Sequence, residues 1–253
     1  MEIENYWVGR RTIRSYSRRE VSMTLIDDLL LKASHAPTTG NMQLYSVVVT
    51  TDEEGKRALA LCHFNQPQVM SAPVVLTFCA DFNRFSRWCE ERGAEPCYDN
   101  FQSFVAAFID TIAFAQQFNT LAELSGLGCC WLGTTTYNAS QISDVLGLPS
   151  LVVPVITLTV GYPAENGVEV GRLPVDAVIH HEKYENYSAA CINDLYAEKE
   201  SRDDSRQFVT ENGKQTLAQV FTDVRYPRKN NELFSDIFLR YLKQAGFLKG
   251  NLL

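Results

Sequence analysis

The chain has 253 residues, 45% of them apolar, which is enough to bury the interior of a globular enzyme. Its formal net charge of −7 argues against the broad positive surface that nucleic-acid binding requires. No basic start leads into an apolar segment, and no run reaches the roughly 18 uncharged apolar residues of a membrane span. We therefore expect a cytoplasmic protein with neither a nucleic-acid partner nor a membrane partner.

Helical and strand patterns alternate along the first 160 residues. Apolar residues recur every three or four positions in the helical segments, and near-continuous β-branched runs mark strands covered on both faces. In chain order, the predicted elements are a helix over 21–33, a strand over 46–51, a helix over 53–62, a strand over 73–80, a helix over 98–125, a strand over 129–134, a helix over 138–146 and a strand over 152–160. Such alternation is typical of an α+β or α/β fold.

Three signals mark the ends of these helices. Ser22 is the expected N-cap of the first helix, and Gly126 is the expected terminator of the long one. Asn138 and Gln141 resemble a capping box at the start of the last predicted helix of this part.

The pattern changes after Gly161. Residues 172–174 form a predicted loop, and residues 198–206 are almost wholly charged or polar. Helical apolar spacing returns over 233–247, which predicts a helix packed on the body of the protein or on a partner subunit. We therefore expect an excursion from the main body rather than a second core.

The seven cysteines are an odd number and include no C-x-x-C pair, so they do not form the pattern of a disulfide framework. A zinc site built from Cys89, Cys97 and His63 is an alternative, but the spacing matches no common ligand pattern. We expect buried, reduced thiols and no metal site. Cys129 and Cys130 are interpreted as packed strand sequence rather than as a redox dithiol. The four histidines show no triad or ligand spacing and are interpreted as ordinary polar residues.

Arg10, Arg11 and Arg14 concentrate positive charge ahead of the first predicted helix in an acidic chain. Guanidinium groups gathered in this way favour an anion site. The alternative is a solvated basic surface with ordinary ion pairs, which is the better interpretation of this segment taken alone.

Two further segments have compositions suited to a flat polar ligand. The loop 36–43 (APTTGNMQ) offers two hydroxyls and two amides that can hydrogen-bond a heteroaromatic ring. The segment 126–134 (GLGCCWLGT) places glycines around an apolar strand, where a backbone can approach a ligand closely. Each has a plainer alternative, which is an ordinary loop in the first case and a tight helix-to-strand connection in the second.

Together and in this order, these segments resemble the nitroreductase family, in particular its NADPH-oxidising, oxygen-insensitive branch. The resemblance covers residues 5 to 185 and is carried by 10–16 (RRTIRSY), 43–49 (QLYSVVV), 78–84 (FCADFNR), 126–133 (GLGCCWLG) and 151–163, which ends in Gly161-Tyr162-Pro163. It implies an α+β sandwich with a central mixed sheet flanked by helices, in an intertwined homodimer. It also implies an FMN-binding core over residues 1–185 and a C-terminal helical excursion over residues 186–253.

The resemblance further implies an FMN site built from both subunits. The cofactor-binding residues that it implies are Arg10, Arg11, Thr12, Arg14, Thr38, Thr39, Gln43, Gln66, Trp131, Leu132, Gly133 and Arg172. In this assignment the arginine segment and Arg172 hold the phosphate and the polar edge of the flavin, and the loop 36–43 reaches the cofactor across the dimer. Leu132 and Gly133 line one ring face, and Gln66 lies near the ring and the substrate. No catalytic side chain is implied, because FMN carries the hydride.

The activity implied by the resemblance is transfer of a hydride from NADPH or NADH to FMN and then to nitroaromatic, quinone or flavin acceptors, by ping-pong exchange. One alternative is a flavin or quinone reductase with the same half-reaction. Another is a non-catalytic FMN-binding protein, because binding FMN requires the same loops as using it. Basic residues in the tail are candidates to meet the 2′-phosphate of NADPH, with solvated surface charge as the alternative: Arg202, Arg206, Arg225 and Arg228.

Overall fold

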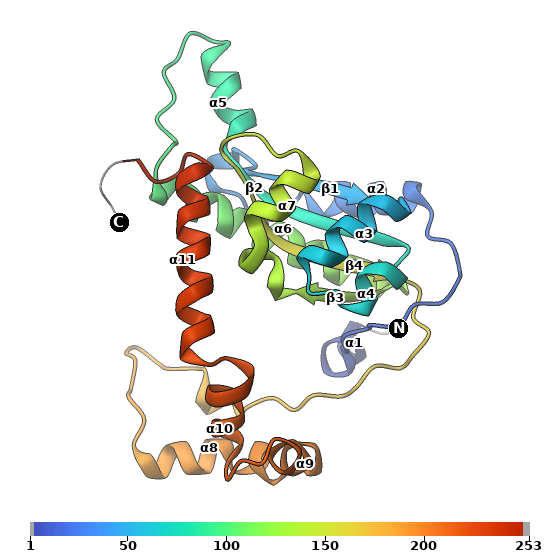
Figure 1. Ribbon diagram of the computed structural model, residues 1–253, viewed down its shortest axis with the longest axis vertical. Coiled ribbons are helices and arrows are strands. Elements are labelled where there is room, and N and C mark those ends of the chain that lie inside the picture. Colours follow the sequence, from blue (N-terminus) through green and yellow to red (C-terminus); the bar gives the residue numbers. More distant parts are fainter. Residues whose placement is uncertain (1–2, 250–253) are drawn as a thin grey trace. The chain divides into compact units, whose positions relative to one another are not determined.

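The computed structural model describes residues 3–249 (Figure 1). The chain forms two units. The first contains the residues up to Val168 together with the segment from Phe234 onward, and the second is Glu169–Leu233. Within the described residues, no helix is long and apolar enough to cross a membrane.

A four-stranded sheet forms the centre of the first unit. Its strands are β1 (Tyr45–Thr50), β2 (Val74–Asp81), β3 (Gly128–Leu132) and β4 (Val152–Gly161), in the spatial order β1-β2-β4-β3. All three pairings between these strands are antiparallel, so the expectation of a mixed sheet is wrong for this sheet. The reason lies in the connections. Two helices carry the chain out and back after β1, so that β2 begins at the end of the sheet where β1 stops.

Helices cover both faces of this sheet (Figure 1). Successive side chains along β2 point to opposite faces of the sheet. Leu76 belongs to the larger hydrophobic cluster on one face, and Val75 belongs to the smaller cluster on the other. The larger cluster contains buried residues of α2 (Met23–Ala33) and α6 (Phe101–Leu124). The smaller cluster lies under α3 (Glu53–Cys62), α4 (Pro67–Ser71) and α7 (Ala139–Leu146). The result is an α+β sandwich, as expected.

The eight elements predicted within the first 160 residues are all present, close to their predicted ends. Gly126 adopts a φ of +85° just beyond α6, as a helix terminator should. Ser22 occupies the N-cap position of α2, but its side chain makes no capping hydrogen bond. The expected capping box at Asn138 is wrong, because the Asn138 amide donates instead to the carbonyl oxygen of Cys62 at 2.6 Å. Three short α-helices of this part were not predicted: α1 (Ile3–Gly9), α4 and α5 (Asn83–Glu90).

The last long helix, α11 (Arg228–Gln244), begins earlier than the predicted 233–247. Its C-terminal part, with Tyr241, Leu242 and then Phe247, is buried in the larger cluster of the first unit. The remaining named helices are α8 (Ala189–Ser201), α9 (Asp203–Glu211) and α10 (Leu217–Val220) in the second unit.

Candidate functional site

The arginine segment lies along the outer edge of β3. The backbone N–H of Ile13 donates to the carbonyl oxygen of Cys129 at 3.1 Å, and Tyr16 forms an antiparallel bridge with Pro163. Gly128 makes this approach possible, because a Cβ at that position would lie 2.6 Å from the Cβ of Ile13. A glycine in the strand therefore lets the basic segment dock against the sheet.

The arginines of this segment have different surroundings. Arg10 Nε lies 3.2 Å from Glu123 Oε2, and the same carboxylate oxygen accepts a hydrogen bond from the Tyr6 hydroxyl at 2.7 Å. Burial raises the pKa of Glu123, and the hydrogen bond from Tyr6 and the charge of Arg10 lower it. Arg10 thus takes part in a partly buried ion pair. Arg11 and Thr12 are half-buried beside it.

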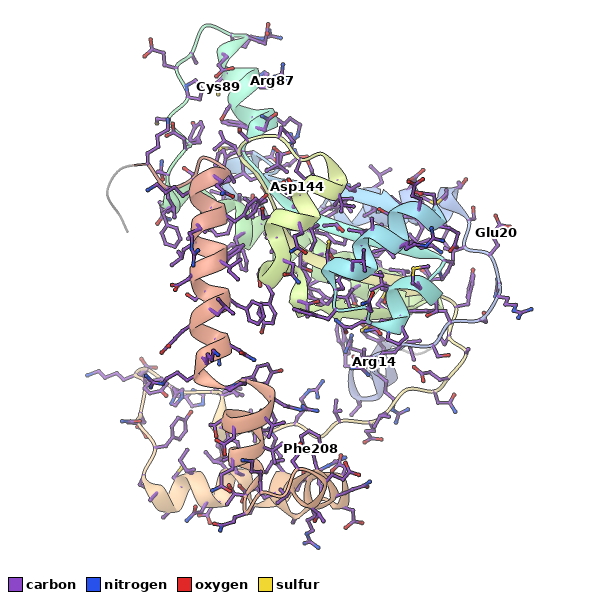
Figure 2. All side chains as sticks on the ribbon, in the orientation of Figure 1. Arg14, Glu20, Arg87, Cys89, Asp144 and Phe208 are labelled. Atoms are coloured by element: carbon purple, nitrogen blue, oxygen red, sulfur yellow. The ribbon has the colours of Figure 1, made fainter. Side chains whose placement is uncertain are left out.

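Arg14 is the exposed cation of the segment (Figure 2). Its backbone N–H donates to Glu165 Oε1 at 2.7 Å, whereas its guanidinium forms no ion pair with any residue that the structure describes. Burial raises the pKa of the Cys130 thiol, and the nearby charge of Arg14 opposes that shift. Arg14 therefore provides a positive charge beside β3, and no carboxylate of the described residues forms an ion pair with its guanidinium.

The loop 36–43 is held by a buried carboxylate that the sequence analysis missed. Asp110 on α6 is 2% exposed. It accepts hydrogen bonds from the Thr38 hydroxyl at 2.5 Å, the Thr39 hydroxyl at 2.9 Å and the Thr39 backbone N–H at 2.9 Å. Thr38 Oγ1 also accepts from the backbone N–H of Gln43 at 2.9 Å. The two hydroxyl hydrogens are therefore already used, and only lone pairs remain for a ligand. The available signal was an aspartate within the apolar stretch FVAAFIDTIAFA of this helix, residues 104–115.

These two groups of predicted site residues lie at opposite corners of the sheet. The loop leads into Tyr45, which aligns through Ala80 with Val153 near the start of β4. The arginine segment contacts β3 beside Val160, near the end of β4. The segment lies one strand spacing outside β3, so strand dimensions put the two groups about 19 Å apart across the sheet and about 23 Å apart along it. One chain therefore does not bring the two groups together.

The turn after β3 has one open position. Leu132 is 1% exposed and belongs to the smaller cluster, so its side chain is not available to a ligand. The indole N–H of Trp131 donates to Asn119 Oδ1 at 2.9 Å, which commits that side chain to α6. Gly133 is exposed, and a Cβ placed there would have no atom within 4 Å. Of Leu132 and Gly133, the two residues expected at the ring face, Gly133 is the one whose surface is open.

Gln66 belongs to a chain of side-chain hydrogen bonds beside this turn. Its Nε2 donates to Thr134 Oγ1 at 3.3 Å, and its Oε1 accepts from Gln68 Nε2 at 2.8 Å. Thr134 Oγ1 also lies 2.8 Å from His63 Nδ1. Burial lowers the pKa of His63 to about 4. Gln66 is a predicted site residue, whereas Thr134 and Gln68 carry no signal of this role in the sequence, and His63 is interpreted from sequence only as an ordinary polar residue.

All seven cysteines are free, and only Cys97 and Cys191 are exposed. Cys129 belongs to the larger cluster and Cys130 to the smaller one, since neighbouring strand residues point to opposite faces. Burial raises the pKa of both thiols. Residues 3–249 contain no group of three or more acidic, histidine or cysteine side chains that would hold a metal ion.

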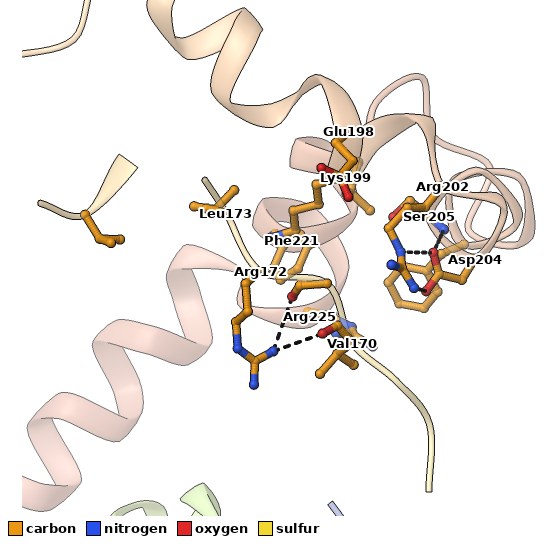
Figure 3. Close-up of a pocket in the computed structure, with 14 residues that line it drawn as sticks. Val170, Arg172, Leu173, Glu198, Lys199, Arg202, Asp204, Ser205, Phe221 and Arg225 are labelled. Carbon is orange, nitrogen blue, oxygen red and sulfur yellow. Dashed lines mark hydrogen bonds and ion pairs between the residues drawn. The ribbon is translucent and has the colours of Figure 1, made fainter. Parts of the chain in front are cut away.

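The second unit has a cavity of about 740 Å³ (Figure 3). Arg172 lines it and donates to the carbonyl oxygens of Val170 and Gly171 at 3.2 Å. Arg225 lies over the Phe208 ring at 4.3 Å, and Arg202 pairs with Asp204 at 3.1 Å. Arg202 and Arg225, two of the four arginines considered for a 2′-phosphate, line this cavity, whereas Arg206 and Arg228 do not.

A family model described as "Nitroreductase family" matches residues 8–162, which include the arginine segment, all four strands and the turn after β3. The chain belongs to the nitroreductase family. The resemblance read from the motifs is therefore confirmed at the level of the family.

Individual relatives extend this likeness along most of the chain. The FMN reductase (NADPH) of Bacillus subtilis (strain 168) is 31% identical over 239 residues, covering 94% of this chain and 90% of that protein. The CR(VI) reductase of Pseudomonas sp. (strain G-1) is 31% identical over 221 residues, covering 85% and 90%. A crystal structure from Bacteroides fragilis NCTC 9343 has 55% identity and a TM-score of 0.94, covering 95% of this chain and 98% of that chain.

Proposed function

We propose that this nitroreductase-family chain is an NAD(P)H-dependent oxidoreductase that uses FMN to pass electrons to small oxidised acceptors. One structural observation carries the proposal. The Arg14 guanidinium, which has no carboxylate partner among the described residues, lies near Cys130 on β3, and the open backbone of Gly133 lies three residues beyond Cys130, in the turn that follows the strand. Strand spacing gives about 10 Å as the upper limit for that interval. A cation and an open backbone at that separation suit an elongated flat ligand with an anionic end, as FMN is.

The residues of this chain have distinct roles in the proposed site. Arg14 favours an anionic group by a fixed positive charge, and the Glu123 pair keeps Arg10 in place beside it. Gly133 allows close approach to a flat ring, and the Gln66 carboxamide is oriented by its two hydrogen-bond partners. Bound FMN supplies hydride and electron transfer. The chain itself binds and orients, and water supplies the protons.

We further propose that the protein is a homodimer in which each site takes its Thr38–Gln43 loop from the other subunit. The placement of the two residue groups at opposite corners of the sheet supports this, since one chain cannot close the site alone. Exposed apolar side chains on α6, such as Ile109 at 60% and Phe101 at 47%, suit a subunit interface. Sedimentation should show two chains, and a folded monomer that retains stoichiometric FMN at micromolar concentration would contradict the shared site.

We propose that residues 1–185 contain the cofactor loops and that the excursion over 186–253 recognises the nicotinamide nucleotide. Arg202 and Arg225 line the cavity of the second unit and are the proposed contacts for the 2′-phosphate of NADPH. Arg172 lines the same cavity, and its contact with the cofactor stays a prediction from the family resemblance. A cytoplasmic location remains the prediction made from the sequence.

Stopped-flow spectroscopy of the FMN-loaded protein tests the central proposal. Bleaching of the flavin by NADPH or NADH should be rapid, and a nitroarene, a quinone and free flavin should each be offered for reoxidation. The fastest of these assigns the acceptor class and decides between a nitroreductase and a flavin or quinone reductase. Bound flavin that neither nucleotide reduces would favour a non-catalytic FMN-binding protein. A protein that takes up no FMN would contradict both.

A further inference from the structure

His63 is a buried histidine in which only one of the two ring nitrogens has a hydrogen-bond partner among the described residues. It follows α3 directly and has no exposed surface. Its Nδ1 lies 2.8 Å from Thr134 Oγ1, whereas its Nε2 is buried and has no hydrogen-bond partner among the residues that the structure describes. Because burial lowers its pKa to about 4, the ring is neutral near pH 7 and carries one N–H.

The position of that proton follows from the surroundings. A proton on Nε2 would leave a buried N–H donor without an acceptor, which is rare in proteins. A proton on Nδ1 leaves only an unused lone pair on Nε2. The Nδ1–H tautomer is therefore favoured, and it donates to Thr134 Oγ1.

This tautomer decides what the Thr134 hydroxyl can do. A hydroxyl has two lone pairs and one hydrogen. His63 Nδ1–H and Gln66 Nε2–H occupy both lone pairs, at 2.8 and 3.3 Å. The hydroxyl hydrogen has no acceptor among the described residues. Thr134 is half-buried and adjoins the exposed Gly133, so this hydrogen remains available to a ligand.

The turn that carries Thr134 is held on both sides. The Thr135 hydroxyl donates to the carbonyl oxygen of Leu132 at 2.7 Å, and the Asn138 amide donates to the carbonyl oxygen of Cys62 at 2.6 Å. Such bonds keep the hydroxyl in one place, which is the condition under which a donor stabilises developing charge.

We propose that His63 is a positioning residue that holds the Thr134 hydroxyl as a hydrogen-bond donor to an oxygen atom of the electron acceptor. This inference rests on the proposed function. Negative charge develops on a nitro or quinone oxygen as electrons arrive, and a prearranged O–H donor stabilises that charge. The acceptor is the ligand in question because Gln66, the residue expected beside the substrate, bonds to the same hydroxyl.

The test measures reoxidation of the NADPH-reduced, FMN-loaded protein by 1,4-benzoquinone and by ferricyanide. Thr134→Val should slow the second-order reaction with the quinone about threefold to tenfold, as expected for one lost neutral hydrogen bond. Ferricyanide offers no oxygen, so its rate should stay unchanged. Thr134→Ser should restore the quinone rate, and His63→Leu should reproduce the loss. Thr136→Val, at another half-buried threonine of the same turn, is the matched control and should behave as wild type.

A second measurement does not depend on activity. Nitrogen-15 spectra of the wild-type imidazoles, with the His63 signals assigned by their absence in His63→Leu, should place the proton on Nδ1. A proton on Nε2 would overturn the proposal, as would a wild-type quinone rate in Thr134→Val. Weaker FMN binding by Thr134→Val with an unchanged quinone rate would also overturn it, because the hydroxyl would then serve the cofactor. A wild-type protein that NADPH and NADH leave unbleached would refute the proposed function, and this inference with it, before any variant is needed.

Discussion

The predicted site residues lie in two regions of the sheet. The β1 corner contains the loop 36–43, and the β3 corner contains the arginine segment and the turn after β3. Their polar groups differ in how many hydrogen-bond partners they have within the protein. At the β1 corner, Asp110 accepts the hydroxyl hydrogens of Thr38 and Thr39, so the loop is braced from inside the protein. At the β3 corner, the Arg14 guanidinium has no carboxylate partner among the described residues, and the Thr134 hydroxyl hydrogen has no acceptor among them. Hydrogen bonds within the protein therefore fix the conformation of the first corner, whereas the second corner has hydrogen-bond donors available to a ligand. Residues that one family resemblance groups together can thus have unlike physical roles.

Removing the Asp110 carboxylate should have the largest effect on stability. Asp110→Ala would leave several donors of the loop without their acceptor, and we expect a loss of about 3 kcal/mol or more in the free energy of unfolding. Urea denaturation measures this. Asp28→Ala is the control, since Asp28 is exposed and its pair with Lys32 should contribute only about 0.3–0.5 kcal/mol. A loss below about 1 kcal/mol in Asp110→Ala would show that the loop does not depend on the carboxylate.

Acidification should weaken the β3 corner through His63. Because burial lowers the pKa of His63 from 6.5 to about 4, the unfolded chain binds a proton over this range that the folded chain does not. The contribution of His63 to stability is therefore complete above pH 6.5 and falls as the pH decreases toward 4, by roughly 3 kcal/mol in total. Unfolding free energies of wild type and His63→Gln should be compared at pH 7 and pH 4.5. Parallel profiles would exclude a depressed pKa at this residue.

Neutralising Arg14 should affect binding rather than folding. A charge-assisted hydrogen bond contributes about 1.5–3 kcal/mol, so Arg14→Ala should weaken FMN binding roughly tenfold to 150-fold. A flavin-fluorescence titration at fixed salt measures the change, and circular dichroism checks the fold. Arg18→Ala, at an exposed arginine four residues beyond Arg14, should change affinity by less than about threefold. An equally small effect at Arg14 would place it among the solvated surface charges.

Substitutions at two glycines of the β3 corner should have the smallest effects. Gly128 tests the packing of the arginine segment on β3, and Gly133 tests the approach of a ligand to the backbone. Gly128→Ala would press a methyl group into Ile13, and we expect a loss of about 1–3 kcal/mol in stability. Gly133→Ala meets no neighbouring atom and should change stability by less than about 0.5 kcal/mol. If the backbone of Gly133 approaches the flavin, the second variant should nevertheless bind FMN more weakly. Thermal unfolding together with an FMN titration distinguishes the two, and the reverse order of stabilities would contradict the docking contact.

Local pattern in the sequence was sufficient for most of the fold. The near-continuous apolar runs at 73–80 and 152–160 became the two central strands, which are buried at every residue, because a strand covered on both faces has no side that meets water and is mostly apolar. The long helix and its terminating glycine followed from periodicity and backbone freedom in the same way. The family also followed from the sequence, because its motifs are short and contiguous.

Only the tertiary structure decided which of the named residues have free bonding capacity. Thr38 meets Asp110 across 72 positions, and His63 meets Thr134 across 71. Neither pairing leaves a periodic signal, since each depends on how the helices and the turn after β3 pack on the sheet. The antiparallel pairing of all four strands and the separation of the two corners likewise depend on the paths of the connections. Sequence determined which groups are present, and packing determined which of them are already satisfied, because a hydrogen bond requires two groups within about 3 Å whatever their distance along the chain.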